Sequence, residues 1–274
     1  MALIPPFFFD TVVAIGATRK EGTRWLATGF LYIHVLDRTE TSVSGPAYLI
    51  TNKHVINGHD MLVIRTNPQE NTAAREYRIK TDPSDPAARW FLHPKPNVDI
   101  AVRPLNFKVL QEHQMKVNAF QHDEHALGRD KLASHGFSEG DGCFVLGFPM
   151  GLVGEFRSTV IVRSGTIATF RDMLDRRSDM YYIDSQVFPG NSGGPVVSRP
   201  ELAAIGGTNA RPRAQLIGIV KGYVPYSEIA TSQQTGASET LRQENSGLAA
   251  VHPVDLIDET IALHLAQEDI KRLA

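Results

Sequence analysis

The chain has 274 residues, of which 42% are hydrophobic and 21% charged, the balance of a folded globular protein and not of a disordered one. Its 28 basic and 30 acidic residues leave a formal net charge of −2, so the charge gives no reason to expect nucleic acid or a membrane as partner. The single cysteine, Cys143, excludes an intramolecular disulfide, which fits a reducing compartment. We therefore expect a cytoplasmic protein.

The N-terminal stretch MALIPPFFFDTVVAIG contains a short apolar patch. No basic residue precedes the patch, two prolines interrupt it, and no small-residue cleavage site follows, so we do not expect a signal peptide. No run in the chain approaches the roughly 18 apolar residues of a membrane helix.

Twelve segments rich in Val, Ile, Tyr and Phe are bounded by turn residues, which is typical of strands. The first series is 11–17, 28–37, 47–56, 60–66, 76–81 and 99–105. The second series is 143–148, 158–170, 180–188, 194–198, 215–224 and 247–253. Two sets of about six strands predict an all-β fold of paired barrels or sandwiches.

The remaining segments are polar or helical in pattern. The polar stretch 227–246 nearly lacks large apolar residues and is expected to be a long mobile loop. The last stretch carries Ile257, Ile261 and Leu265 at steps of four and has an acidic start and a basic end, which predicts a helix. The expected division is a first barrel at 1–107, a partly helical connection at 108–139, a second barrel at 140–252, and a helix at 253–274.

The stretch FPGNSGGPVV, residues 188–197, places three glycines around Ser192. A surface turn would explain one or two of them. A nucleophilic serine explains the arrangement better, because its hydroxyl must be exposed and backbone N–H groups must converge on the oxygen that becomes negative. Glycine permits the backbone angles that turn such N–H groups inward.

A serine hydroxyl needs a base, and histidine serves best near neutral pH. Among ten histidines, His54 in TNKHVI stands out because it follows a strand pattern and opens a turn. His122 and His125 have helical spacing for metal ligands, but with no third ligand or paired cysteines we expect no metal and interpret them as solvated surface residues.

The base in turn needs a carboxylate that fixes its tautomer. Asp99 is the best candidate, because a charged residue at the head of the apolar run DIAV is unusual unless it is held in place. An aspartate at a strand edge is the plainer interpretation. Asp60 lies closer to the histidine in sequence, beyond the turn, and is the weaker candidate.

The motifs TNKHVI, DIAV and PGNSGGPV together resemble those of the trypsin-like serine peptidases, in the same His–Asp–Ser order. GDGCFVLGFPMGL (140–152) and VRSGTIATF (162–170) are most similar to the bacterial Htr/Deg-type branch. The resemblance extends over roughly residues 9 to 265, although only the three motifs are specific.

The resemblance implies a chymotrypsin-like fold, with two six-stranded antiparallel β-barrels and the site in the cleft between them. Ser192 would be the nucleophile, His54 the general base and Asp99 the orienting carboxylate, with no cofactor. The N–H groups of Gly190 and Ser192 would form the oxyanion hole. A protein or peptide substrate is implied.

The chain also departs from the family that it resembles. Asn191 stands where secreted trypsins have an aspartate that pairs with a new N-terminus, so we expect activity without N-terminal processing. No peptide-binding domain of the Htr/Deg type is expected after the last strands and helix. We therefore expect loops or an activating protein partner to control the activity. The segments 227–246 and 171–179 are the candidate sensors.

The resemblance also predicts the substrate pocket, with Gln186 at its base and Gly222 on its wall. A neutral Gln186 leaves a cationic substrate side chain unpaired, which predicts cleavage after uncharged residues. A register shift would bring Asp184 into the pocket instead and favour Lys or Arg.

Other functions remain open. A catalytically silent trypsin-like domain would act as a binding module, and an esterase would use the same triad. An α/β-hydrolase elbow is disfavoured because a strand pattern, not a helix, follows Ser192. A cysteine protease is disfavoured because Cys143 lies within a strand and is expected in the core.

Overall fold

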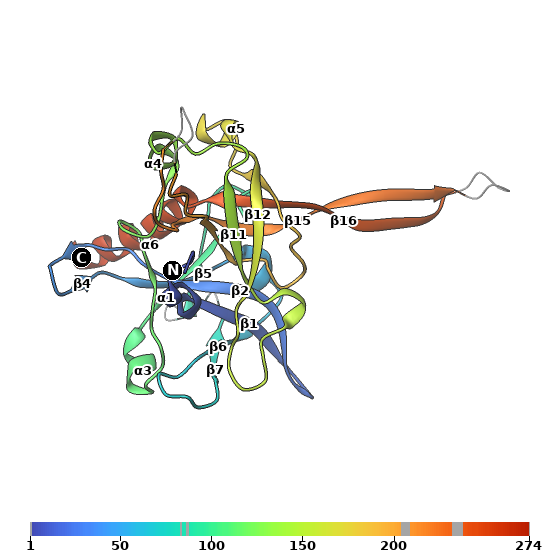
Figure 1. The fold of residues 1–274 in the computed structure, drawn as a ribbon. Helices are drawn as coiled ribbons and strands as arrows, with labels where there is room; N and C mark the ends of the chain where they lie inside the picture. The colour runs from blue at the N-terminus through green and yellow to red at the C-terminus, as the bar shows by residue number, and fades with distance from the viewer. Residues whose placement is uncertain (1, 83, 86–87, 204–208, 232–237, 274) are drawn as a thin grey trace.

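The computed structural model describes the chain except residues 1, 83, 86–87, 204–208, 232–237 and 274. Two β-structures make up the molecule, one from each half of the chain, with a helix at the C-terminus (Figure 1). The predicted all-β class of two antiparallel six-stranded units and a C-terminal helix is confirmed. The second unit is a closed barrel, whereas the first is a curled sheet.

The first sheet has six principal strands, in the spatial order β7-β6-β1-β2-β5-β9, and two very short ones that extend it, β8 beside β9 and β10 beside β2. All pairs are antiparallel except β10 with β2. The strands are β1 (Val12–Arg19), β2 (Gly22–Ile33), β5 (Ala47–Thr51), β6 (Met61–Thr66), β7 (Arg75–Lys80), β8 (Phe91–Leu92), β9 (Ala101–Leu105) and β10 (Phe120–Gln121). A small separate hairpin joins β3 (Asp37–Arg38) and β4 (Val43–Ser44).

The second unit is a closed barrel in the order β11-β12-β13-β16-β15-β14. Its inward residues, such as Val145, Ile183 and Ile217, are fully buried, as the alternation of apolar residues along the strands requires. The strands are β11 (Gly142–Gly147), β12 (Ile161–Thr169), β13 (Tyr181–Asp184), β14 (Pro195–Ser198), β15 (Leu216–Thr231) and β16 (Ser238–Pro253).

The helices connect or cap these units. The N-terminal apolar patch forms α1, whose Phe8 is buried against Phe120 with ring centroids 4.7 Å apart. The connection between the two units is partly helical, as predicted. The helices are α1 (Pro6–Thr11), α2 (Lys53–Ile56), α3 (Phe107–Glu112), α4 (Arg129–Ser134), the 3-10 turn η2 (Pro149–Gly151), α5 (Arg171–Leu174) and α6 (Asp255–Leu273). No helix in the described ranges is long and apolar enough to cross a membrane.

The prediction of a mobile loop at 227–246 is wrong for residues 227–231 and 238–246, which form strands, and residues 232–237 lie outside the described part of the chain. β15 and β16 continue past the barrel as a two-stranded ribbon, paired from Gly218↔Pro253 to Thr231↔Ser238. Figure 1 shows this ribbon projecting well away from the barrel. Polar residues suit a ribbon that has water on both faces, and the barrel strands already fix its register, so the ribbon needs no apolar face of its own.

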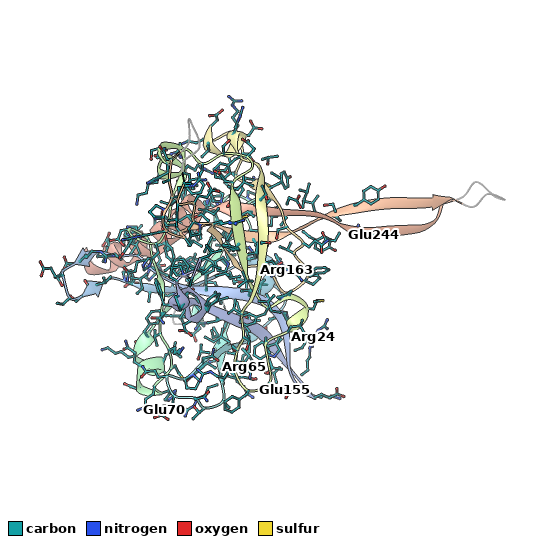
Figure 2. All side chains as sticks on the ribbon, in the orientation of Figure 1. Arg24, Arg65, Glu70, Glu155, Arg163 and Glu244 are labelled. Carbon is teal, nitrogen blue, oxygen red and sulfur yellow. The ribbon has the colours of Figure 1, made fainter. Side chains whose placement is uncertain are left out.

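The two units share one core. A cluster that includes Phe30 of the first sheet, Leu146 and Ile219 of the barrel, and Ile257 of α6 is fully buried between them. At the far end, Arg65 of β6 donates hydrogen bonds of 2.7 Å to the carbonyls of Gly154 and Glu155. Figure 2 shows Arg65 and Glu155 side by side there. The relative position of the units is therefore fixed by packing and by hydrogen bonds.

Candidate active site

His54 lies where β5 ends and the one-turn helix α2 begins. The observed strand ends at Thr51, three residues before His54. It is therefore shorter than the strand predicted for residues 47–56. The hydroxyl of Thr51 donates to the carbonyl of Thr28 on the neighbouring strand at 2.9 Å. The His54 side chain is 52% exposed. A rigid strand end thus holds an accessible imidazole.

Asp99 contacts His54 twice. Its Oδ2 lies 2.5 Å from Nδ1 of His54, and its Oδ1 accepts the His54 backbone N–H at 3.1 Å. Burial works to raise the pKa of Asp99, but the hydrogen bonds and charge of His54 outweigh it and lower that pKa below its usual value. Asp99 is therefore an ionised carboxylate that fixes the Nδ1–H tautomer of the imidazole and leaves Nε2 as the free nitrogen.

The other candidates take no part in this contact. Asp60 is exposed, and its carbonyl accepts a hydrogen bond from Thr81 at 3.0 Å. His122 and His125 are not solvated surface residues, because both are half-buried and each Nδ1 accepts a backbone N–H, from Val35 and Gln121, at 3.0 Å. These two histidines organise the connecting segment.

Two carbonyl groups of the serine loop, residues 188–194, accept backbone hydrogen bonds. The carbonyl of Pro189 accepts the N–H of Met150 at 2.6 Å, and the carbonyl just before Ser192 accepts the N–H of Gly194 at 2.9 Å. Each trans peptide directs its N–H opposite to its carbonyl. The N–H groups of Gly190 and Ser192 are thus directed away from these contacts, and neither has an acceptor within the described part of the chain.

Two glycines of this loop meet the same two constraints. Gly190 has a φ of +103°, and a Cβ there would lie 2.3 Å from the Phe148 carbonyl oxygen. Gly193 has a φ of +81°, and its Cβ would lie 2.2 Å from the carbonyl oxygen of Thr28. Both positions therefore need glycine for the backbone conformation and for close approach, Gly190 to the Phe148 carbonyl and Gly193 to the first sheet.

Thr28 of β2 is a positioning residue that the sequence did not single out. Its N–H donates to the carbonyl of Ser192 at 2.9 Å, and its hydroxyl donates to the carbonyl of Gly190 at 2.6 Å. The same hydroxyl accepts the N–H of Phe148 at 3.0 Å. A buried threonine inside an apolar strand carries no signal of such a role, because β-branched residues are ordinary in strands.

Asn191 stabilises the loop without a charge. It is fully buried, and its Oδ1 accepts the N–H of Phe188 at 3.0 Å. Its Nδ2 has no hydrogen-bond partner among the described residues. A neutral amide at this position needs no ammonium partner, unlike a buried carboxylate.

Ser192 is half-buried on the barrel side of the site, and Gly222 of β15 lies beside it, since a Cβ on Gly222 would be 4.0 Å from the Ser192 hydroxyl. No hydrogen bond joins His54 to Ser192 in the described structure. The side chains of Gln186 and Asp184 are both exposed, so the choice between them as pocket residue stays a prediction.

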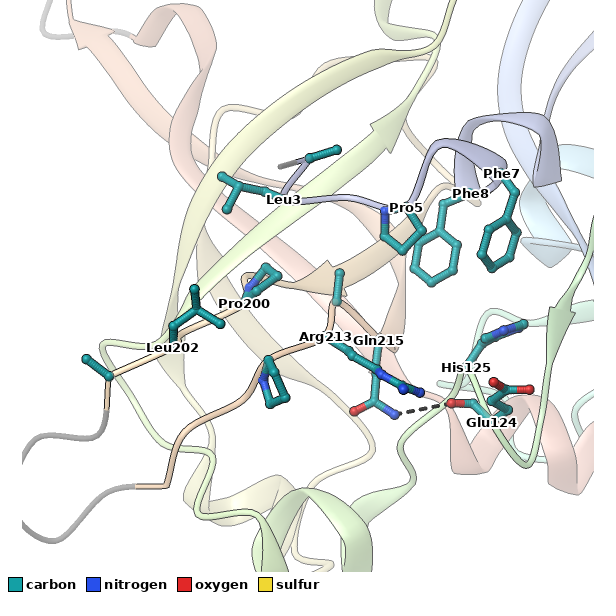
Figure 3. Close-up of a pocket in the computed structure, with 14 residues that line it drawn as sticks. Leu3, Pro5, Phe7, Phe8, Glu124, His125, Pro200, Leu202, Arg213 and Gln215 are labelled. Carbon is teal, nitrogen blue, oxygen red and sulfur yellow. Dashed lines mark hydrogen bonds between the residues drawn. The ribbon is translucent and has the colours of Figure 1, made fainter.

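A large apolar cavity lies elsewhere. Its volume is about 670 Å³, and Figure 3 shows it between the N-terminal segment and the chain that connects β14 to β15. Leu3, Phe7, Phe8 and Leu202 form its apolar walls, and His125 also lines it, but it contains none of His54, Asp99 and Ser192. Cys143 is fully buried on β11, and burial raises the pKa of its thiol to about 12, which confirms it as a core residue.

Comparison with known proteins places the chain in a family. Residues 27–206 match the trypsin-like peptidase domain. No curated protein matches the chain significantly. Similar solved structures include the apo MamO protease domain from Magnetospirillum magneticum, with 14% identity, 92% of this chain and 96% of that chain covered, and a TM-score of 0.46. Another is the inactive serine-to-alanine mutant of Rv3671c from M. tuberculosis H37Rv, with 14% identity and a TM-score of 0.44. The match covers 95% of this chain and 94% of that chain. The family match spans most of the chain, and we conclude that the protein belongs to the trypsin-like peptidase domain family.

Proposed function

We propose that the protein is a serine endopeptidase that cleaves peptide bonds through an acyl-enzyme. Ser192 attacks the carbonyl carbon, and His54 accepts the serine proton through Nε2 and later gives it to the leaving amine. Asp99 stabilises the imidazolium that forms in between. The N–H groups of Gly190 and Ser192 donate to the oxygen that becomes negative.

The observation that supports this most strongly is the asymmetry of hydrogen bonding around the site. The Asp99 carboxylate is committed to His54 on both of its oxygens. The two N–H groups of the serine loop, in contrast, lack acceptors within the described residues although the neighbouring peptides are fully bonded. Free, pre-oriented donors beside a serine are what stabilisation of a tetrahedral oxyanion needs.

For specificity, we propose cleavage after uncharged residues. Gln186 offers no counter-charge, and Gly222 leaves room beside Ser192. A lysine or arginine side chain held there would lose its hydration without gaining an ion partner. Asp184 is the alternative, and a preference for Arg or Lys would favour it.

We also propose that activity is kept latent until a protein partner or a loop rearrangement triggers it. The base of the β15–β16 ribbon supports this, because Asn245 of β16 donates from Nδ2 to the carbonyl of Val187 at 2.6 Å, close to the serine loop. A partner bound to the ribbon would therefore act on the segment that holds Gln186. The segment 171–179 is the second candidate sensor.

Hydrolysis of a diverse peptide library tests the activity and the specificity together. Wild-type protein is expected to cleave after uncharged residues, and Ser192→Ala to cleave nothing. A proteome-wide cleavage profile of the same two proteins then identifies cellular substrates. If wild-type and Ser192→Ala proteins give the same profile, with and without cell extract as a source of activator, the domain is a binding module and not an enzyme.

A further inference from the structure

A fully buried histidine outside the proposed triad joins the two β-units behind Asp99. His252 of β16 is 0% exposed. Its Nε2 lies 3.1 Å from the backbone nitrogen of Asp99, and its Nδ1 lies 2.8 Å from the carbonyl oxygen of Asp179. The backbone N–H of Asp99 can only donate, so Nε2 accepts, and Nδ1 carries the proton that it donates to Asp179.

Asp179, whose carbonyl accepts the hydrogen bond from His252, also binds the segment that leads to Asp99. The carboxylate of Asp179 accepts from Nζ of Lys95 at 2.7 Å and from Nδ2 of Asn97 at 3.1 Å. Segment 95–99 of the first unit is thus bonded at several points to the second unit. His252 makes the contact closest to the carboxylate, on the main chain of Asp99 itself.

His252 is also connected to the serine loop through the barrel. It pairs with Ile219 on β15. The next residue, Val220, accepts the N–H of Gly193 through its carbonyl and donates its own N–H to the carbonyl of Gly194, both at 2.9 Å. The strand pair that carries His252 therefore also holds the residues directly after Ser192.

We propose that His252 is a positioning residue that sets the distance between the His54–Asp99 pair and Ser192. The inference rests on the proposed function, because it concerns the alignment of that catalytic site. Asp99 and His54 belong to the first sheet and Ser192 to the barrel, so some contact must fix one relative to the other. Misplacement of reacting groups by about 1 Å can cost about 100-fold in rate.

The surroundings keep His252 in the required form. Burial lowers its pKa to about 4, so the imidazole is neutral and Nε2 stays an acceptor at neutral pH. The charged groups that face it are Asp99 and Asp179, which favour protonation, and Lys221, which opposes it. The neutral imidazole thus serves one donor and one acceptor at the same time.

Two substitutions separate the two hydrogen bonds of His252. Glutamine places its amide oxygen as many bonds from Cα as Nε2, so His252→Gln can still accept from Asp99. Asparagine places its amide nitrogen as many bonds from Cα as Nδ1, so His252→Asn can still donate to Asp179 but cannot reach Asp99. Each variant removes one buried hydrogen bond, which makes their losses of stability comparable. Thr11→Val, which removes a buried hydroxyl bond to the Phe8 carbonyl far from the site, serves as the remote control.

The test is steady-state hydrolysis of a fluorogenic peptide together with crystal structures of the wild type and the variants. We expect His252→Asn to lower kcat about 10- to 100-fold with little change in KM, and His252→Gln and Thr11→Val to stay within a few-fold of wild type. In the crystal structures, Asp99 and His54 should be displaced relative to Ser192 only in His252→Asn. Equal kcat losses in both His252 variants, or unmoved side chains in His252→Asn, would overturn the proposal. A wild-type protein that does not hydrolyse peptides either alone or with cell extract as a source of activator contradicts the proposed function instead, and the crystal structures still decide the positioning role.

Discussion

The two halves of the candidate site are built in opposite ways. On the first sheet, Asp99 is hydrogen-bonded at every polar group: its N–H to His252, its carbonyl to Asn52 Nδ2 at 2.7 Å, and its carboxylate to His54. On the barrel, the carbonyls of residues 188–192 accept hydrogen bonds, but the N–H groups of Gly190 and Ser192 have no acceptors in the described structure.

The difference follows from what each half would do in catalysis. A base and its carboxylate must be held in one orientation before the substrate arrives, and hydrogen bonds achieve that. Donors that stabilise an oxyanion must instead be free until the charge develops, so only backbone conformation can hold them. Apart from the loss of the Ser192 hydroxyl itself, side-chain changes are therefore expected to damage the first half, and backbone changes the second.

The largest effect is expected from removing either reacting group. His54→Ala or Ser192→Ala should lower kcat by about 10⁵- to 10⁶-fold, because residues of such a site act as a unit. Neither side chain is fully buried, so the melting temperature should barely change. Peptide turnover and circular dichroism melts of the purified variants check both statements, and residual turnover well above background would exclude that residue as a reacting group.

Asp99→Asn is expected to come next. The amide keeps the shape but favours the wrong histidine tautomer, which should lower kcat about 10⁴-fold. Asp60→Asn is the matched control, since Asp60 is exposed and contacts the fold through its carbonyl. Turnover that depends on Asp60 as much as on Asp99 would mean that the carboxylate has been assigned to the wrong residue.

A backbone change tests the other half. Gly190→Ala forces a side chain into a positive φ and against the Phe148 carbonyl, and should destabilise the protein by roughly 3 kcal/mol and abolish activity. Gly140→Ala has a comparable φ of +94° but open space around it, so it should cost about 1 kcal/mol and keep activity. Urea titrations and peptide assays of the two variants measure the difference. Gly140→Ala shows the effect of backbone strain alone, and Gly190→Ala shows the effect of strain together with steric overlap.

The smallest effects on activity concern pH, because they act through stability alone. His252 titrates near pH 4 in the fold, below its ordinary value of 6.5, so the unfolded chain binds the extra proton between these limits. This group therefore adds stability above pH 6.5 that is lost as the pH falls towards 4, by about 3 kcal/mol at most. In His252→Gln, the free energy of unfolding should no longer fall by this amount between pH 6.5 and pH 4. Urea unfolding from pH 4 to 7 measures it, and identical slopes in the two proteins would mean that His252 does not titrate as stated.

A second pH effect acts in the opposite direction at the C-terminal helix. Burial raises the pKa of Asp258 to about 7, although the hydroxyl of Tyr32 donates to it at 2.9 Å. The folded protein therefore holds a proton that the unfolded chain releases above about pH 4, and stability falls as the pH rises towards 7. Asp258→Asn should be more stable than wild type at pH 8 by a few kcal/mol at most. Thermal melts of both proteins at pH 5 and pH 8 test this. If the melting temperature of Asp258→Asn differs from that of the wild type by the same amount at both pH values, the raised pKa of Asp258 is contradicted.

The sequence predicted the strands and the His54–Asp99 pairing well, because alternating apolar runs and short motifs are local signals. It did not predict the β15–β16 ribbon, since polar composition favours a loop unless the barrel strands that continue into it are known. Thr28 and His252 were also missed. Their roles depend on contacts with residues more than a hundred positions away, which no local pattern encodes.

Labelling with a fluorophosphonate probe tests the central claim most directly, because the probe reacts only with a serine that a neighbouring base has activated. The account predicts one modified residue, Ser192, identified by mass spectrometry of the labelled peptide. It also predicts no labelling in His54→Ala, in which Ser192 is present but its base is removed. Labelling of His54→Ala at the wild-type rate, or of any serine other than Ser192, would contradict it.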